Sequence, residues 1–485
     1  AEAAALSFNA GLDVELPGDD CAKDLKEALS RGLITPAKID EIAARVLREK
    51  FRLGLFENPY ADDGRIVLQR REAVDVARQT AEESVTILDN NGILPLSPGK
   101  KVAVIGPTAD DPLALLGDYA FPVHLIHNEA QEEVESVVTP LAGLRAKLGA
   151  ENVIYARGCN ILDERKAGAP VFPGDVDDST SLEQASSLSS RLDMIPSAVE
   201  AAKNADVAIV CVGDLSGIFQ TGTVGEGSDA DTLELPGVQQ KLLYAVIETG
   251  KPVIVVISSG RPYNLGGAEE KIAAQVMTFF SGQEGGTALA SVLTGAVEPS
   301  GRLTLSIPHN VGAAPYFYNH SFKSSGTPIA RHFGSRYPFG HGLSYTDFEF
   351  SDLRLESETV DIETGTVHLS FMVKNVGERD GVAVPQLYVR DEIATLVRPV
   401  KELKAFGKLA LKPGASARVT FEVPTDMLNF TGYEGCRIVE PGFFTLMVGA
   451  SSGDIKLKAR VEVTGERRML PADWRMLSGF AVDKA

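Results

Sequence analysis

The spacing of apolar residues along the chain changes near residues 72 and 348. Between these points, short runs of β-branched residues alternate with segments whose apolar positions recur at helical spacing. The clearest case is residues 207–257, where two apolar runs flank a segment of helical periodicity. Parallel strands need such a crossover helix, so this stretch predicts a βαβ unit. We therefore expect residues 72–310 to form an α/β sandwich domain built on a parallel sheet.

After residue 348 the apolar positions alternate with a period of two, in short segments separated by Gly and Pro. This pattern predicts an antiparallel β-sandwich of the immunoglobulin or fibronectin type III kind over residues 348–465. Residues 311–347, which are rich in aromatic residues and His, are expected to be a linker. The polar residues 466–485 are expected to form an extended C-terminal arm.

Residues 1–56 combine three segments of helical periodicity with a strand-like segment at residues 11–17. So few elements cannot bury a core by themselves. They look like the last βα unit of a larger domain, and the polar residues 57–71 that follow are expected to be a linker.

The composition of the chain says little about its fold but narrows the kinds of partner that it can bind. The formal net charge of −19 argues against nucleic acid or an anionic membrane surface. No apolar run reaches the roughly 18 residues of a membrane span. The four Cys residues lack the spacing of metal or redox sites, and free thiols favour a reducing compartment such as the cytoplasm. The sequence begins without Met, so an export route is left open.

The connection after residues 207–212 is rich in glycine and carries one carboxylate, Glu226, between Gly225 and Gly227. Open α/β sheets bind ligands at the carboxyl ends of their strands. Glycines also let the backbone approach a ligand closely. Glu226 is therefore a candidate active-site residue, although a carboxylate in such a loop is more often simply solvated.

Two other motifs are weaker. His124 and His127 have ligand-like spacing, but no further Cys, Asp or His joins them, so no metal site is expected. Residues 282–286 lack the Gly-Lys-Ser/Thr ending of a phosphate-binding loop and the third glycine of a dinucleotide-binding loop. We interpret them as a tight βα turn, and no cofactor is expected.

Several segments, in the same order, resemble glycoside hydrolase family 3. They are VGEGSDADTLELPGVQQKLLYAV, GQEGGTALASVLTGAVEPSGRLTLSIP and RYPFGHGLSYTDF, with GDYAFPVH fitting the bacterial β-glucosidases and β-xylosidases. AGLDVELPG resembles the final strand of the family's N-terminal (β/α)₈ barrel. The family's layout is that barrel, an α/β sandwich and a fibronectin type III-like domain. Residues 1–56 are thus expected to be a remnant of the barrel, its last βα unit.

The resemblance implies a retaining, exo-acting β-glycosidase that hydrolyses terminal non-reducing β-linked sugars, a β-glucosidase first and a β-xylosidase next. Glu226 falls on the family's general acid/base, with Asp214 and Asp231 as the nearest alternatives. Asp229 is expected to orient the loop. Ala230 stands where many members carry an Arg that buttresses the loop, so the loop's support is left open. Phe219 is a candidate for stacking on the aglycone.

The family's nucleophile, an Asp in a Ser-Asp-Trp motif on the seventh barrel strand, has no counterpart here. The only Trp is Trp474, which follows the sandwich, so we reject Asp473 as the nucleophile. We expect the chain to be part of a longer enzyme, or a partner chain to supply the barrel, and the chain alone to be inactive. A non-catalytic carbohydrate-binding or adhesion protein is the alternative. The sugar, the linkage and a homodimer are left open.

Overall fold

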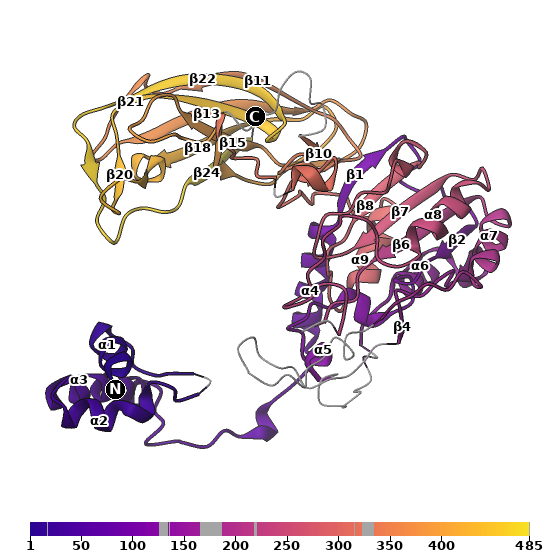
Figure 1. Ribbon diagram of the computed structural model, residues 1–485. Coiled ribbons are helices and arrows are strands. Elements are labelled where there is room, and N and C mark those ends of the chain that lie inside the picture. The colour runs from indigo at the N-terminus through magenta and orange to yellow at the C-terminus, as the bar shows by residue number, and fades with distance from the viewer. Residues whose placement is uncertain are drawn as a thin grey trace. The chain divides into compact units, whose positions relative to one another are not determined.

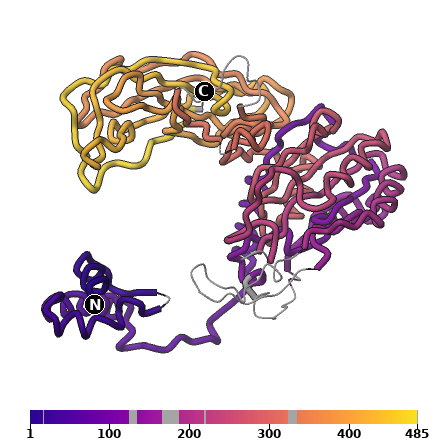
Figure 2. The backbone as a smooth tube through the Cα atoms, in the orientation of Figure 1, coloured from indigo at the N-terminus to yellow at the C-terminus, as the bar shows by residue number. Residues whose placement is uncertain are grey.

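The computed structural model describes residues 1–16, 18–125, 134, 136–164, 187–217, 221–314, 316–322 and 334–484. The chain divides into two compact units, Ala1–Arg70 and Arg71–Ala485 (Figures 1 and 2). No helix of the described part of the chain is long and apolar enough to cross a membrane.

The first unit is small and helical. Its elements are α1 (Glu2–Ala10), η1 (Ala22–Asp24), α2 (Leu25–Ser30), α3 (Pro36–Arg52) and η2 (Asp63–Arg65). Helix α3 begins at a favourable N-terminal sequence, because the Thr35 hydroxyl accepts a hydrogen bond from the Lys38 N–H and Pro36 lies in the first turn. The buried apolar core consists of only Ala5, Phe8, Ala28, Ile34 and Ile42.

The strand expected at residues 11–17 does not form over residues 11–16, and Pro17 lies outside the described residues. A strand needs a neighbour to accept and donate its backbone hydrogen bonds. The described part of this unit contains no other strand. Glu15 instead caps the following turn, and its carboxylate accepts hydrogen bonds from the Cys21 and Ala22 N–H groups at 3.0 and 2.7 Å.

The second unit begins with a six-stranded sheet in the order β1-β8-β7-β6-β2-β3. The strands are β1 (Thr86–Asn90), β2 (Val102–Ile105), β3 (Val153–Ala156), β6 (Val207–Gly213), β7 (Val253–Ser258) and β8 (Ala274–Met277). All neighbours are parallel except β1 and β8. The predicted parallel sheet is thus confirmed, with an antiparallel strand at one edge, as is common in such sheets.

Helices cover both faces of this sheet. They are α4 (Arg71–Ser84), α6 (Pro140–Leu148) and α9 (Gly285–Leu293) on one face and α7 (Ile195–Lys203) and α8 (Gln239–Ile247) on the other. Successive side chains of a strand point to opposite faces. Val104 therefore packs in the core with Leu141 of α6, while its neighbour Ile105 packs in the core with Ala198 of α7.

Residues 303–306 do not form a strand. The backbone of Leu303 instead exchanges hydrogen bonds with Gly340 and His341, both at 2.8 Å. The nearby strand β9 (Ile307–Pro308) pairs with β10 (Ser335–Tyr337). Residues 335–346 are therefore more than a linker, because the Leu343 N–H also donates to the Ile87 carbonyl of β1 at 2.8 Å.

The β-sandwich is confirmed as well, with a four-stranded and a five-stranded sheet around one apolar core. The first sheet holds β11 (Phe348–Leu355), β13 (Thr366–Asn375), β18 (Ser416–Pro424) and β24 (Gly479–Lys484). The second holds β12 (Thr359–Asp361), β22 (Asp454–Thr464), β21 (Gly442–Ser451), β15 (Gln386–Asp391) and β16 (Glu402–Phe406).

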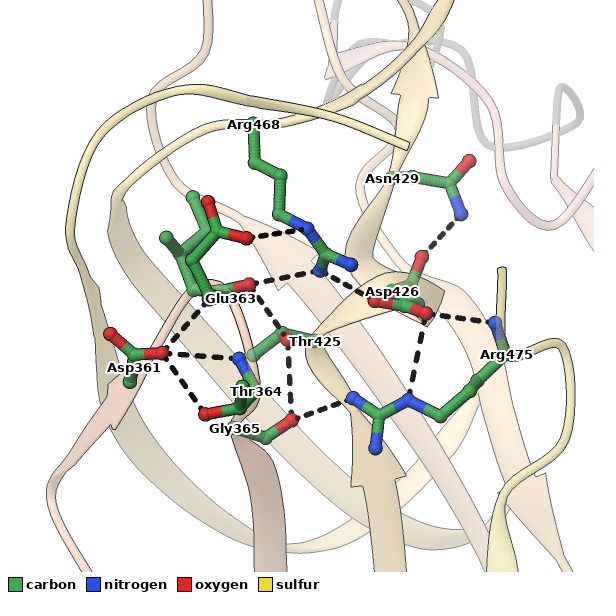
Figure 3. A network of polar contacts seen from close by, with 10 residues as sticks. Asp361, Glu363, Thr364, Gly365, Thr425, Asp426, Asn429, Arg468 and Arg475 are labelled. Atoms are coloured by element: carbon green, nitrogen blue, oxygen red, sulfur yellow. Dashed lines mark hydrogen bonds and ion pairs between the residues drawn. The ribbon is translucent and has the colours of Figure 1, made fainter. Parts of the chain in front are cut away.

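The C-terminal residues differ from the extended arm that we expected. After Thr464 the chain crosses back and ends in β24, which pairs antiparallel with β18 as an edge strand of the sandwich. Ion pairs and hydrogen bonds hold this segment in place (Figure 3). Asp426 Oδ1 accepts from Arg468 Nη1 at 2.7 Å, and its Oδ2 accepts from the Arg475 N–H at 2.8 Å. Arg468 also pairs with Glu363 at 3.2 Å.

Candidate active site

The candidate site lies where β6 ends, at the carboxyl edge of the parallel sheet. Every residue of β6 is buried, and the chain leaves it at Gly213 with φ near +141°. Gln239 at the start of α8 closes this connection. Its buried side-chain amide accepts from the Gly213 N–H and donates to the Gly213 carbonyl, both at 2.8 Å. The segments that follow β2 and β7 leave the sheet at the same edge.

Glu226 has an exposed side chain on this loop, and two residues that follow β2 hold it. Its carboxylate Oε2 accepts a short hydrogen bond from the Tyr119 hydroxyl. Its backbone N–H donates to Asp118 Oδ2 at 3.0 Å. The hydrogen bond to Glu226 raises the pKa of the Tyr119 phenol, so Tyr119 is a hydrogen-bond donor at neutral pH.

The turn that carries Glu226 is tightly packed. Gly217 donates its N–H to the Val224 carbonyl and accepts the Ser228 hydroxyl on its own carbonyl, both at 2.9 Å. Gly225 and Gly227 have φ of +127° and +68°, which only glycine adopts readily. A Cβ at Gly225 would lie 2.4 Å from the Gly217 carbonyl oxygen. The glycines of the motif thus permit a narrow turn with Glu226 at its exposed end.

Asp214 is fully buried at the start of the loop. Its carboxylate accepts hydrogen bonds from the hydroxyls of Thr223 and Tyr263, both at 2.6 Å, and from that of Ser259. A buried carboxylate engaged in this way cannot reach a ligand outside the sheet edge. Asp229 and Asp231 are exposed. Asp214 is thus a structural residue, unlike the exposed Asp229 and Asp231.

The remaining predicted residues contribute less. Phe219 and His127 lie outside the described residues, and His124 belongs to the short helix α5 (Phe121–Leu125). No group of three or more His, Cys, Asp or Glu residues within the described ranges could hold a metal ion. Asp473 is exposed in a turn before β24, in the sandwich. The (β/α)₈ barrel of the family is not present among the residues that the structure describes.

Sequence reasoning missed Asp118 and Tyr119 as site residues. They belong to the GDYAFPVH segment, which resembles the family, but neither has a spacing relation to Glu226. The hydrogen bond from Tyr119 to Glu226 spans 107 positions of sequence. The missing signal is the adjacency of β2 and β6 in the sheet, which brings the two loops together.

Comparison with known proteins agrees with this architecture. Residues 85–345 match the glycosyl hydrolase family 3 C-terminal domain, and residues 383–452 match the fibronectin type III-like domain. A periplasmic β-glucosidase of Salmonella typhimurium is 34% identical, over 94% of this chain and 59% of that protein. A β-xylosidase of Formosa agariphila is 35% identical, over 94% of this chain and 60% of that protein.

A solved structure of a β-glucosidase involved in saponin metabolism, from intestinal bacteria, superposes with a TM-score of 0.82. It is 31% identical, and the match covers 95% of this chain and 64% of that one. The chain thus spans about 60% of the length of the relatives it matches. Because the family match alone extends over residues 85–345, the chain belongs to glycosyl hydrolase family 3.

Proposed function

We propose that this chain supplies the acid/base part of a retaining, exo-acting β-glycosidase that hydrolyses terminal β-linked glucose, with xylose as the next candidate. The observation that carries the proposal is the placement of Glu226. It is an exposed carboxylate on a glycine turn at the carboxyl edge of a parallel sheet, where such sheets bind ligands. The two sugars follow from the names of the Salmonella and Formosa relatives.

In this reaction Glu226 acts twice. As an acid it transfers its proton to the glycosidic oxygen while a nucleophilic carboxylate attacks the anomeric carbon and the C–O bond breaks. As the resulting carboxylate it removes a proton from water, which attacks the glycosyl intermediate and releases the sugar and the nucleophile. The Tyr119 hydroxyl donates to the carboxylate form of Glu226 and so orients it for the second step.

The nucleophile, an Asp by the family's pattern, is proposed to come from residues outside this sequence. A retaining enzyme needs two carboxyl groups about 5–5.5 Å apart. Asp118 contacts the Glu226 backbone N–H, and Asp473 belongs to the sandwich, so neither offers that second group. The chain on its own should therefore release no nitrophenol from a nitrophenyl β-glucoside.

The test uses this chain fused behind the (β/α)₈ barrel of a family member. Glu226→Gln should slow the hydrolysis of an alkyl β-glucoside by about 10²–10⁴-fold, because alkoxide is a poor leaving group without a proton. The glycosylation step of a dinitrophenyl β-glucoside needs no proton and should be nearly spared. Azide should restore turnover of that activated substrate by direct attack, which gives a β-glucosyl azide.

Asp231→Asn is the matched control, because Asp231 is an exposed acid of the same loop. It should show neither the leaving-group dependence nor the azide effect. If Glu226→Gln slows both substrates equally and azide has no effect, the acid/base role of Glu226 is wrong.

A further inference from the structure

The loop that carries Glu226 is held by an arginine from another segment of the chain. Arg261 lies three residues beyond the end of β7, the neighbour of β6 in the sheet. Its guanidinium Nη2 donates to the Thr223 carbonyl at 2.9 Å and to the Ser228 carbonyl at 2.8 Å. Both bonds are charge-assisted, and their acceptors lie on either side of Glu226.

Asp214 connects the same loop to the segment that bears Arg261. On the loop side, it accepts the Thr223 hydroxyl at 2.6 Å. On the other side, it accepts the hydroxyls of Ser259 and Tyr263. The Ser259 oxygen in turn accepts the Arg261 N–H at 2.9 Å. Because Asp214 is fully buried, removing any of these donors would leave part of its carboxylate unsatisfied.

We propose that Arg261 is a positioning residue for Glu226, held in register with the loop by the buried carboxylate of Asp214. The inference rests on the proposed function of Glu226 as acid/base. Arg261 acts through the backbone on both sides of the turn. A general acid must be placed to within about 1 Å, and a misplacement of that size can reduce the rate about 10²-fold. The glycines leave the turn flexible, and the two hydrogen bonds from one guanidinium to its carbonyls restrain it.

The first test measures amide hydrogen exchange in this chain as it stands. In Arg261→Met, the amides of Gly217 and Thr223, which bond to the Val224 and Leu215 carbonyls, should exchange at least about tenfold faster than in the wild type. Arg379→Met is the matched control, because Arg379 also donates to a backbone carbonyl, that of Gly295, elsewhere in the fold. It should leave the loop amides unchanged. Wild-type exchange of both amides in Arg261→Met would overturn the proposal.

The second test uses the barrel fusion. Arg261→Met should lower kcat for the alkyl β-glucoside by about 10–100-fold with little change in KM, and should nearly spare the glycosylation step of the dinitrophenyl substrate. In a Glu226→Ala background the same substitution should have less than about a threefold further effect, because the positioned group is gone. Arg261→Lys, which keeps a cationic donor, should recover part of the loss.

The outcomes separate the inference from the function on which it rests. Suppose that the rate loss in Glu226→Ala depends on the leaving group, while Arg261→Met slows both substrates equally. The rate loss in Arg261→Met then comes from general destabilisation, and the positioning role is wrong. If Glu226→Ala shows no leaving-group dependence, the proposed function fails and the inference falls with it. Should Arg261→Met not fold, Tyr263→Phe removes one donor to Asp214 at almost unchanged volume, and the same two readouts apply.

Discussion

Among single residues, glycines with a positive φ differ in why a larger residue would not fit at their positions. Gly225 has φ near +127° and no room for a Cβ, since the Gly217 carbonyl oxygen would lie 2.4 Å away. Gly250, in the turn after α8, also has a positive φ, near +73°, but a Cβ there would meet nothing within 4 Å. Gly225 is needed both for its positive φ and because no Cβ fits there, whereas Gly250 is needed for its positive φ alone.

We expect Gly225→Ala to lower the free energy of unfolding by more than about 2–3 kcal/mol, because it combines a strained φ with a steric clash. Gly250→Ala should cost about 1 kcal/mol, the strain of a left-handed residue. Urea unfolding of the two variants checks the comparison. Equal losses would mean that the Glu226 turn rearranges to accommodate the methyl group.

Asp391, at the end of β15, is a single side chain that should make stability depend on pH. Burial raises the pKa of its carboxyl to about 6, although Arg398 acts in the opposite direction and Glu440 and Glu402 add to the rise. The unfolded value is about 3.9, so the folded state holds the proton more tightly. The stabilisation from the protonated form is full below about pH 4 and is lost as the pH rises through about 6.

The free energy of unfolding of Asp391→Asn should therefore fall less than that of the wild type as the pH rises from about 4 to 6. At pH 7 the variant should be more stable by about 1–2 kcal/mol, a figure reduced for the partial exposure of the site. Denaturant unfolding at a series of pH values measures the difference. Asp380→Asn, an exposed residue of the same sandwich, should follow the wild-type curve.

At the scale of elements, the C-terminal segment is held in the sandwich by both strand pairing and ion pairs. Strand β24 pairs with β18 from Glu422↔Gly479 to Ala417↔Lys484. The segment before it is anchored on the buried side chain of Asp426 (Figure 3). Burial alone would raise the pKa of Asp426, but hydrogen bonds from the Arg475 N–H and the Arg468 guanidinium outweigh it and hold the pKa below its ordinary value.

Asp426→Asn should lower the free energy of unfolding by about 2–3 kcal/mol at neutral pH, because charged hydrogen bonds to two arginines are weakened. The folded pKa is lowered, so this contribution is full above about pH 4 and disappears as the pH falls through the folded value. The variant and the wild type should converge in stability in acid. Asp473→Asn, an exposed change in the same segment, should stay within about 0.5 kcal/mol of the wild type at every pH.

At the scale of the whole molecule, the chain comprises two units of very different size, Ala1–Arg70 and Arg71–Ala485. The smaller one exposes several large apolar side chains, each more than half accessible to solvent. They include Leu6, Val14, Leu16, Phe51, Leu53 and Phe56. A unit of this size with a core of five buried residues lies below what usually folds alone. The larger unit has two extensive cores, in the sheet and in the sandwich.

Amide exchange of the whole chain should accordingly be fast over residues 2–52 and slow in the strands of the larger unit. A chain that begins at Arg71 should keep the melting temperature of the full chain, because the stable cores lie within Arg71–Ala485. Strong protection of α1 and α3 in the isolated chain would contradict this. It would mean that the exposed apolar side chains are covered in solution.

The sequence by itself determined both fold classes, because the period of apolar positions reports which face of a segment is buried. The runs of β6 and β7 and the alternation in β13 are examples. The glycine-rich loop also made Glu226 a candidate site residue, since the motif is local. Only the tertiary structure placed Tyr119 and Asp118 beside Glu226 and Arg261 beneath its turn. These contacts depend on the order β7-β6-β2 in the sheet, and the pairing of β24 depends in the same way on which strand it meets. The period of the apolar positions shows which face of a segment is buried, but it does not show which other segment packs beside it.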